Sequence, residues 1–248
     1  MVDDCGRRVG DDKAGAWLLR RGMPHAPARL AIFDCDGTLV DSHANICRAM
    51  EAAFAGVRVD APSREAIRGI VGLSLVEAVA ALAPDADAGF HAAVADDYKT
   101  AFQHMRAEGL LDAEPLYDGL VDALDELADE GWIFGVATGK SDRGLAHVLA
   151  HHGLSTRFVT LQTADRHPSK PHPSMIHAAL AEAGADPNLA VMIGDTSYDM
   201  EMARAAGVRA IGVTWGYHDE AVLHASGAHA VVHRYCDLAA AMVPEATA

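Results

Sequence analysis

Residues 30–41 are Leu30-Ala31-Ile32-Phe33-Asp34-Cys35-Asp36-Gly37-Thr38-Leu39-Val40-Asp41, an apolar run that ends abruptly in two acids. A short continuous apolar run is typical of a strand that is buried on both faces of a parallel sheet. Ligands of such sheets bind outside the carboxyl ends of the strands, which is where Asp34 and Asp36 fall. Gly37 lets the backbone turn sharply there. The stretch therefore predicts a buried strand with a functional site at its end.

The chain from residue 115 onward alternates apolar runs with segments of helical periodicity. Five runs predict further strands, at residues 132–137, 158–161, 190–193, 210–213 and 230–232. Such alternation implies right-handed crossovers, so we predict an α/β fold with a doubly wound parallel sheet. Because the carboxyl ends of parallel strands share one edge, we expect Thr138 and Asp195 to lie beside Asp34 and Asp36.

The segment between the first two strands has a different character. It is rich in alanine, shows helical patterns broken at proline and glycine, and contains no convincing strand. We therefore predict a helical cap at residues 44–114, inserted into an α/β core made of residues 29–43 and 115–248. Residues 1–28 show neither periodicity nor an apolar face, so we expect an N-terminal extension without stable structure, with Met23 as an alternative start.

Composition narrows the classes of partner. The formal net charge is −15 and the pI is near 5.2, which argues against nucleic acid or an anionic membrane surface, since both attract basic patches. No apolar run approaches the ~20 residues of a membrane-spanning helix. The four cysteines are scattered without framework spacing, which fits a reducing cytoplasm. We expect a small phosphorylated metabolite as partner, and the sequence does not indicate an oligomeric state.

Two segments carry candidate anion-binding groups: the end of the second predicted strand and the proline-rich loop around Lys170. Thr138 and Gly139 lie where a strand meets a helix, so a hydroxyl and backbone N–H groups can hold an anion there, although an ordinary helix-capping threonine is an equal alternative. Lys170 follows Pro168 and precedes Pro171, and these prolines stiffen the loop around one cation. Such a lysine suits a phosphate or a buried acid, and a solvated surface lysine is the alternative.

The apolar run 190–193 is stopped by Gly194-Asp195, and Asp199 follows one helical turn later. An acid at the end of a buried strand is costly unless it is paired or bound to a metal. Asp199 can orient Lys170 or a metal-bound water, and an acid favoured by the helix dipole is the alternative.

The order of these motifs resembles that of the haloacid dehalogenase superfamily, most of whose members are magnesium-dependent phosphatases. The first motif is Asp34-x-Asp36, the second is Thr138, the third is Lys170-Pro171 and the fourth is Gly194-Asp195-x-x-x-Asp199. The likeness covers the chain from about Leu30 to its end. It is strongest to phosphoglycolate phosphatases and to their pyrophosphatase and phosphosugar-mutase relatives, and it implies a helical cap of the C1 type.

The resemblance implies a role for each site residue. Asp34 attacks phosphorus to form an aspartyl-phosphate, and Asp36 protonates the leaving oxygen and later activates water. Oxygens of Asp34, Asp195 and the Asp36 backbone hold Mg²⁺, which offsets the repulsion between a carboxylate and a phosphate dianion.

The remaining motif residues surround the substrate. Thr138, Gly139 and Lys170 bind the phosphoryl oxygens, and Asp199 supports Lys170 from behind. In the turn 68–74, Arg68 is expected to bind a carboxylate of the leaving group, with Arg64 as a second candidate, and a solvated helix face is the alternative.

These roles favour Mg²⁺-dependent hydrolysis of a small phosphomonoester, with a phosphoglycolate-like substrate preferred. A phosphosugar mutase or a pyrophosphatase of the same fold is the alternative, although mutases of this group tend to have valine where Thr38 stands. The intact acid pair argues against a non-catalytic binding protein. Hydrolytic dehalogenases lack the second acid of the first motif, so the presence of Asp36 argues against that activity.

Overall fold

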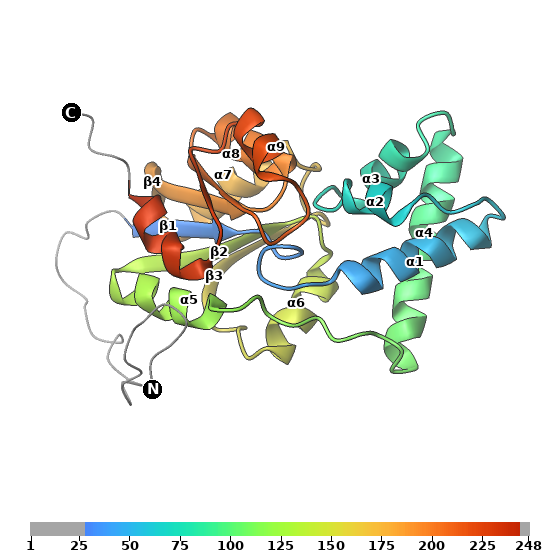
Figure 1. Cartoon of the computed structure of the whole chain (residues 1–248), viewed down its shortest axis with the longest axis horizontal. Helices are drawn as coiled ribbons and strands as arrows, with labels where there is room; N and C mark the ends of the chain where they lie inside the picture. Colours follow the sequence, from blue (N-terminus) through green and yellow to red (C-terminus); the bar gives the residue numbers. More distant parts are fainter. Residues whose placement is uncertain (1–27, 244–248) are drawn as a thin grey trace.

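The molecule is organised around a six-stranded, wholly parallel sheet (Figure 1). The computed structural model describes residues 28–243. The strands are β1 (Ala28–Phe33), β2 (Trp132–Thr138), β3 (Phe158–Thr163), β4 (Ala185–Gly194), β5 (Arg209–Val213) and β6 (Ala230–Val232). Their order across the sheet is β3-β2-β1-β4-β5-β6, so the doubly wound α/β fold predicted from the sequence is confirmed.

Helices cover both faces of the sheet. One face carries α5 (Leu120–Asp129), α6 (Asp142–His151) and α10 (Leu238–Met242), and the other carries α7 (Ser174–Ala183), α8 (Ser197–Ala206) and α9 (Glu220–Ala225). A 3₁₀ turn, η1 (Tyr235–Asp237), precedes α10. Successive side chains of β1 serve the two layers alternately: Ala31 and Phe33 pack toward α5 and α6, and Leu30 and Ile32 pack toward α7 and α8. Burial on both faces explains why the run is uninterrupted.

Four helices of the described chain lie between β1 and α5. They are α1 (His43–Gly56), α2 (Arg64–Arg68), α3 (Leu75–Leu82) and α4 (Ala88–Ala107). They form a group beside the sheet (Figure 1). This group has an apolar cluster of its own, which includes Met50, Phe54, Ile67, Val79 and Val94. The assignment of residues 44–114 as a separate cap domain stays a prediction, and this helical group is the part of the structure to which it refers.

Some local expectations differ from the structure. Strand β4 begins at Ala185, five residues earlier than the apolar run, because Ala185 pairs with Ala28 before an irregular stretch of the ladder. Ser42 precedes α1 but makes no capping hydrogen bond to it, since its hydroxyl donates to Asp36 instead. The expected extension at residues 1–28 lies outside the described residues except for Ala28. No helix within residues 28–243 has the length and apolarity needed to cross a membrane.

Candidate active site

The ends of the three central strands bring the predicted acids together. β1 lies between β2 and β4, so Asp34 follows the middle strand, while Thr138 ends β2 and Asp195 follows β4. The Asp34 amide still donates to the Ile193 carbonyl at 2.9 Å, which fixes the first acid in register with β4. All three side chains are buried. The parallel topology therefore places groups that are far apart in sequence around one point.

A tight turn after β1 sets the second acid. The amides of Leu39 and Val40 both donate to the Cys35 carbonyl, and Gly37 has a φ of +84°, in the left-handed region that favours glycine. A Cβ atom at Gly37 would also collide with the side chains of Asp195 and Tyr217. The turn is therefore packed directly against Asp195.

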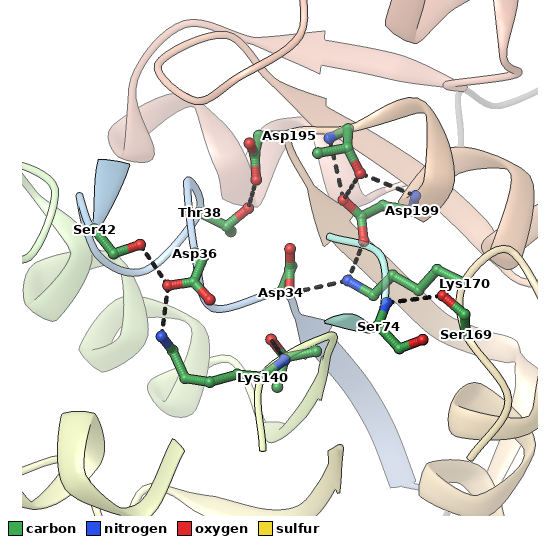
Figure 2. A network of polar contacts seen from close by, with 12 residues as sticks. Asp34, Asp36, Thr38, Ser42, Ser74, Lys140, Ser169, Lys170, Asp195 and Asp199 are labelled. Atoms are coloured by element: carbon green, nitrogen blue, oxygen red, sulfur yellow. Dashed lines mark hydrogen bonds and ion pairs between the residues drawn. The ribbon is translucent and has the colours of Figure 1, made fainter. Parts of the chain in front are cut away.

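Lys170 is buried between two carboxylates rather than exposed on its loop. Its Nζ atom lies 2.9 Å from Asp34 Oδ1 and 2.6 Å from Asp199 Oδ1, and all three side chains are at most 1 % exposed (Figure 2). Asp199 is itself held by α8, because its Oδ2 accepts from the amide and hydroxyl of Thr196 in a capping box. A helix start thus fixes the acid that positions the lysine.

Burial controls the charge states of this group. It raises the pKa of Asp34 to about 7, although Lys170 opposes the shift, and the negative charge of Asp199 adds to it. For Lys170, burial alone would lower the pKa, but Asp199 and then Asp34 outweigh it and raise the pKa above the usual value. The lysine therefore stays charged, while ionisation of Asp34 is costly in the metal-free protein.

Asp195 completes a cluster of three buried acids. Its Oδ1 accepts from the Thr38 hydroxyl at 2.7 Å and its Oδ2 accepts from the Tyr217 amide at 2.9 Å. Burial, followed by the charges of Asp34 and Asp199, raises the pKa of Asp195 well above its usual range. One oxygen from each acid of the cluster Asp34, Asp195 and Asp199 lies within 4.8 Å of the others.

This cluster fits a hard divalent cation. Three carboxylates face one ammonium group, so the ionised cluster carries excess negative charge. The Oδ2 atom of Asp34 is also buried without a hydrogen-bond partner in the described part of the chain. Mg²⁺ binds to oxygen ligands, and the excess negative charge of this cluster would attract it. Within residues 28–243, Asp34 has a free Oδ2, and the oxygens of Asp195 accept only from two neutral donors, so these two acids would hold the ion. Asp199 is instead paired with the Lys170 ammonium.

The second acid, Asp36, has two partners that the sequence analysis missed. Lys140 Nζ lies 2.8 Å from Asp36 Oδ1, and the Ser42 hydroxyl donates to the same oxygen, so Oδ2 carries neither contact (Figure 2). Burial alone would lower the pKa of Lys140, but Asp36 outweighs it and raises the pKa. The sequence contained a signal for Lys140, which directly follows Thr138-Gly139. Ser42 occupies the position just before α1, but its hydroxyl binds Asp36 instead of the helix.

Thr138 and Gly139 lie against the turn that leads into α3. Thr138 Oγ1 accepts from the Lys140 amide at 3.2 Å, and a Cβ atom on Gly139 would come within 2.5 Å of the Leu73 carbonyl oxygen. The same turn is tied to the loop before Lys170, because the Ser74 amide donates to Ser169 Oγ at 2.8 Å (Figure 2). The segment 72–74 therefore closes over the strand ends.

Arg68 does not lie where the sequence analysis expected it. Its Nε and Nη2 atoms donate to the backbone carbonyls of Tyr217 and Gly216, and it is absent from the walls of the cavity described next. Arg64 forms a bidentate pair with Glu51 on the surface. Arg68 is thus bound to the loop after β5, beside Asp195, and Arg64 to Glu51 of α1, so neither residue lines the cavity.

A cavity of about 810 Å³ opens between the strand ends and the helical group α1–α4. The polar floor carries Asp34, Asp36, Thr138, Gly139 and Lys140, and residues of α1, α3, α4 and α6 form the walls. A substrate in this cavity would meet both acids at once.

Comparison with known proteins agrees with this geometry. Residues 31–213 match the sequence model described as haloacid dehalogenase-like hydrolase. A Dickeya dadantii protein named as a probable phosphatase, IndB, is 36 % identical over 86 % of this chain and 92 % of its own length. A phosphoglycolate phosphatase of Agrobacterium fabrum is 31 % identical over 77 % of this chain and 82 % of its own.

A solved structure supports the same assignment. A haloacid dehalogenase-like family hydrolase from Streptococcus pneumoniae superposes with a TM-score of 0.74 at 25 % identity, and the match covers 86 % of this chain and 97 % of that one. The likeness thus extends over the sheet and the helical group alike.

Proposed function

Because the chain belongs to the haloacid dehalogenase-like hydrolase family, we propose that it is a phosphatase that hydrolyses a small phosphomonoester with Mg²⁺ and an aspartyl-phosphate intermediate at Asp34. The observation that carries the proposal is the buried Asp34 carboxylate, held on one oxygen by Lys170 and lacking a hydrogen-bond partner on the other among residues 28–243. A carboxylate fixed in this way is oriented for attack and has an oxygen available for it.

In the first half of the reaction, an Asp34 oxygen forms a bond to phosphorus as the ester P–O bond breaks. Lys170 offsets negative charge on the phosphoryl oxygens, and the Thr138 hydroxyl can donate to them. A proton passes from Asp36 Oδ2 to the leaving oxygen, while Lys140 and Ser42 hold Oδ1. When bound, Mg²⁺ supplies charge neutralisation between the carboxylate and the phosphate dianion.

In the second half, Asp36 accepts a proton from a water molecule, whose oxygen bonds to phosphorus as the Asp34–phosphorus bond breaks. Inorganic phosphate and the free Asp34 carboxylate result. Carboxylated esters such as phosphoglycolate are the first substrates to test. The cytoplasmic location and the absence of nucleic-acid partners stay predictions.

The decisive experiment compares the purified protein with its Asp34→Asn and Asp36→Asn variants. Phosphate release from a chromogenic aryl phosphate and from phosphoglycolate should require Mg²⁺, vanish in Asp34→Asn, and fall by roughly 10²- to 10⁴-fold in Asp36→Asn, the range that proton transfer contributes. Mass spectrometry of a quenched reaction should show one added phosphoryl group on the peptide with Asp34.

Near wild-type turnover in either variant would refute the assignment. A phosphosugar mutase would instead return the phosphoryl group to the sugar and release little inorganic phosphate, so a sugar phosphate belongs in the panel.

A further inference from the structure

The cavity above the acids is much larger than a two-carbon ester requires. Its volume of about 810 Å³ lies in the upper part of the range for small-molecule sites. At ~30 Å³ per water molecule, this is space for more than ~20 waters. The volume therefore suits a phosphate ester with a longer leaving group than glycolate.

The outer walls of the cavity are mainly apolar. Met50 of α1, Leu75 of α3, and Tyr98 and Phe102 of α4 line it, and the rings of Tyr98 and Phe102 contact each other with centroids 5.9 Å apart. Aromatic faces contribute large contact areas to ligands that are themselves flat or apolar. This wall fits an apolar or aromatic segment of the leaving group.

Two arginines in the same walls have no acid to bind within residues 28–243. Arg106 of α4 has a buried Nε atom without a hydrogen-bond partner, and its guanidinium lies 5.4 Å from the centre of the Phe102 ring. Arg143 of α6 forms neither a hydrogen bond nor an ion pair from its side chain in the described chain, and it lines the cavity as well. By contrast, Lys99 and Lys140 in these walls are paired with Asp96 and Asp36.

Acids are abundant in this chain, whose net charge is −15, yet none of them pairs with Arg106 or Arg143 in the described residues. A buried donor left without a partner is costly, so a group that satisfies Arg106 is expected from a ligand. Arg106 also lies near α6. The pKa of His147 on that helix is lowered first by burial and second by the positive charge of Arg106. Arg106 and Arg143 therefore both line the cavity, one from α4 and the other from α6.

On the basis of the proposed function, we propose that the substrate is a phosphate monoester whose leaving group carries a second anionic group beyond an apolar or aromatic segment. Arg106 and Arg143 bind the second anion, and Tyr98 and Phe102 contact the segment. This assigns to α4 and α6 the recognition of the leaving group that the sequence analysis had placed on Arg68. A planar guanidinium suits a carboxylate or a phosphate, since both accept paired hydrogen bonds.

The test uses a matched pair of substrates, benzyl phosphate and 4-carboxybenzyl phosphate. Their methylene group separates the reacting oxygen from the carboxylate, so they differ mainly in the second anion. The wild-type enzyme should prefer the carboxylated ester by about 10- to 100-fold in kcat/KM, the range expected for hydrogen bonds to a charged group. An ester with a phosphonate in place of the carboxylate tells which anion is bound better.

The variants Arg106→Gln and Arg143→Gln should each reduce this preference by about tenfold or more, mainly through KM, whereas Arg106→Lys should keep part of it. Arg48→Gln is the matched control, because Arg48 pairs with Asp112 on the surface away from the cavity. Melting temperatures of all variants separate misfolding from lost recognition.

The outcomes separate the two proposals. Hydrolysis of both esters at equal kcat/KM, or a preference that survives both glutamine variants, would overturn the assignment of Arg106 and Arg143 and leave the phosphatase proposal intact. Failure to hydrolyse these esters, phosphoglycolate and the chromogenic aryl phosphate in Mg²⁺ would overturn the phosphatase proposal, and the inference with it.

Discussion

At the scale of single residues, Asp34 combines complete burial with the capacity for a negative charge. Its pKa of about 7 in the folded, metal-free protein compares with 3.8 for an unperturbed aspartate. At pH values between these two pKa values, Asp34 holds a proton in the folded protein but not in the unfolded chain. The free energy of unfolding therefore falls as pH rises through this interval, and the whole penalty is present above about pH 7.

We expect Asp34→Asn to stabilise the metal-free protein above neutral pH, because it removes this titration. Urea unfolding in chelator at about pH 8 should show a gain of roughly 1 to 3 kcal/mol, which shrinks toward zero near pH 4. Asp125→Asn, an exposed acid paired with Arg157, is the control and should show no such pH dependence. A gain that is the same at both pH values would contradict the assigned pKa.

Lys170 gives the second prediction at this scale. Replacement by methionine leaves Asp34 and Asp199 buried without their cation, so Lys170→Met should lower the free energy of unfolding by about 3 to 5 kcal/mol and abolish turnover. Lys99→Met, at an exposed pair with Asp96, should change stability by less than about 1 kcal/mol.

A double-variant cycle checks the cause of the Lys170 effect. Asp34→Asn should restore part of the lost stability of Lys170→Met, because one of the two uncompensated charges is gone. Strictly additive effects of the two substitutions would show that Lys170 does not stabilise the fold through its pair with Asp34.

At the scale of elements, the end of α2 is tied to the loop after β5. Arg68 donates to the Gly216 and Tyr217 carbonyls, and the Tyr198 hydroxyl donates to the Gly69 carbonyl at 3.0 Å. These contacts link the helical group to the core beside Asp195. Arg68 is therefore a residue that holds two elements together.

Arg68→Ala should consequently raise KM for carboxylated and uncharged esters by a similar factor of several-fold, because the turn 72–74 loses support. The same change should lower the free energy of unfolding by about 1 to 3 kcal/mol, since it removes hydrogen bonds from a charged donor. Steady-state kinetics on both ester types provide the check, with Arg64→Ala as control for an exposed arginine on the same helix. Selective loss on the carboxylated ester alone would return the leaving-group role to Arg68.

At the scale of the whole molecule, metal binding should stabilise the fold, because the acid cluster joins β1, β4 and α8. A ligand that binds only the folded protein at a hundredfold excess over its Kd adds ~2.7 kcal/mol. Mg²⁺ should thus raise the melting temperature of the wild type by several degrees, and chelator should reverse the rise.

The Asp195→Asn variant should lose this response to Mg²⁺, and Asp125→Asn should keep it. This readout requires no catalytic turnover, so it tests the metal site separately from the reaction. An equal rise in melting temperature for Asp195→Asn would place the ion elsewhere.

The sequence by itself determined the sheet and the acids at its edge. Burial on both faces makes a parallel strand continuously apolar, so the ends of β1 and β4 were visible as the points where Asp34 and Asp195 interrupt the runs. The alternation of strands and helices then predicted a doubly wound parallel sheet, because crossovers between parallel strands are right-handed, and the structure supplied the order of its strands. These features depend on the local pattern of apolar and polar residues, which can be read from a single sequence.

Only the tertiary structure decided which long side chains reach the site. Lys140 and Ser42 bind Asp36, Arg106 and Arg143 line the cavity, and Arg68 turns away to the carbonyls of the β5 loop. The lysine and arginine side chains can swing through several ångströms from their backbone positions, so their partners depend on how the helical group packs against the strand ends. That packing joins segments distant in the chain, and no periodicity in the sequence encodes it.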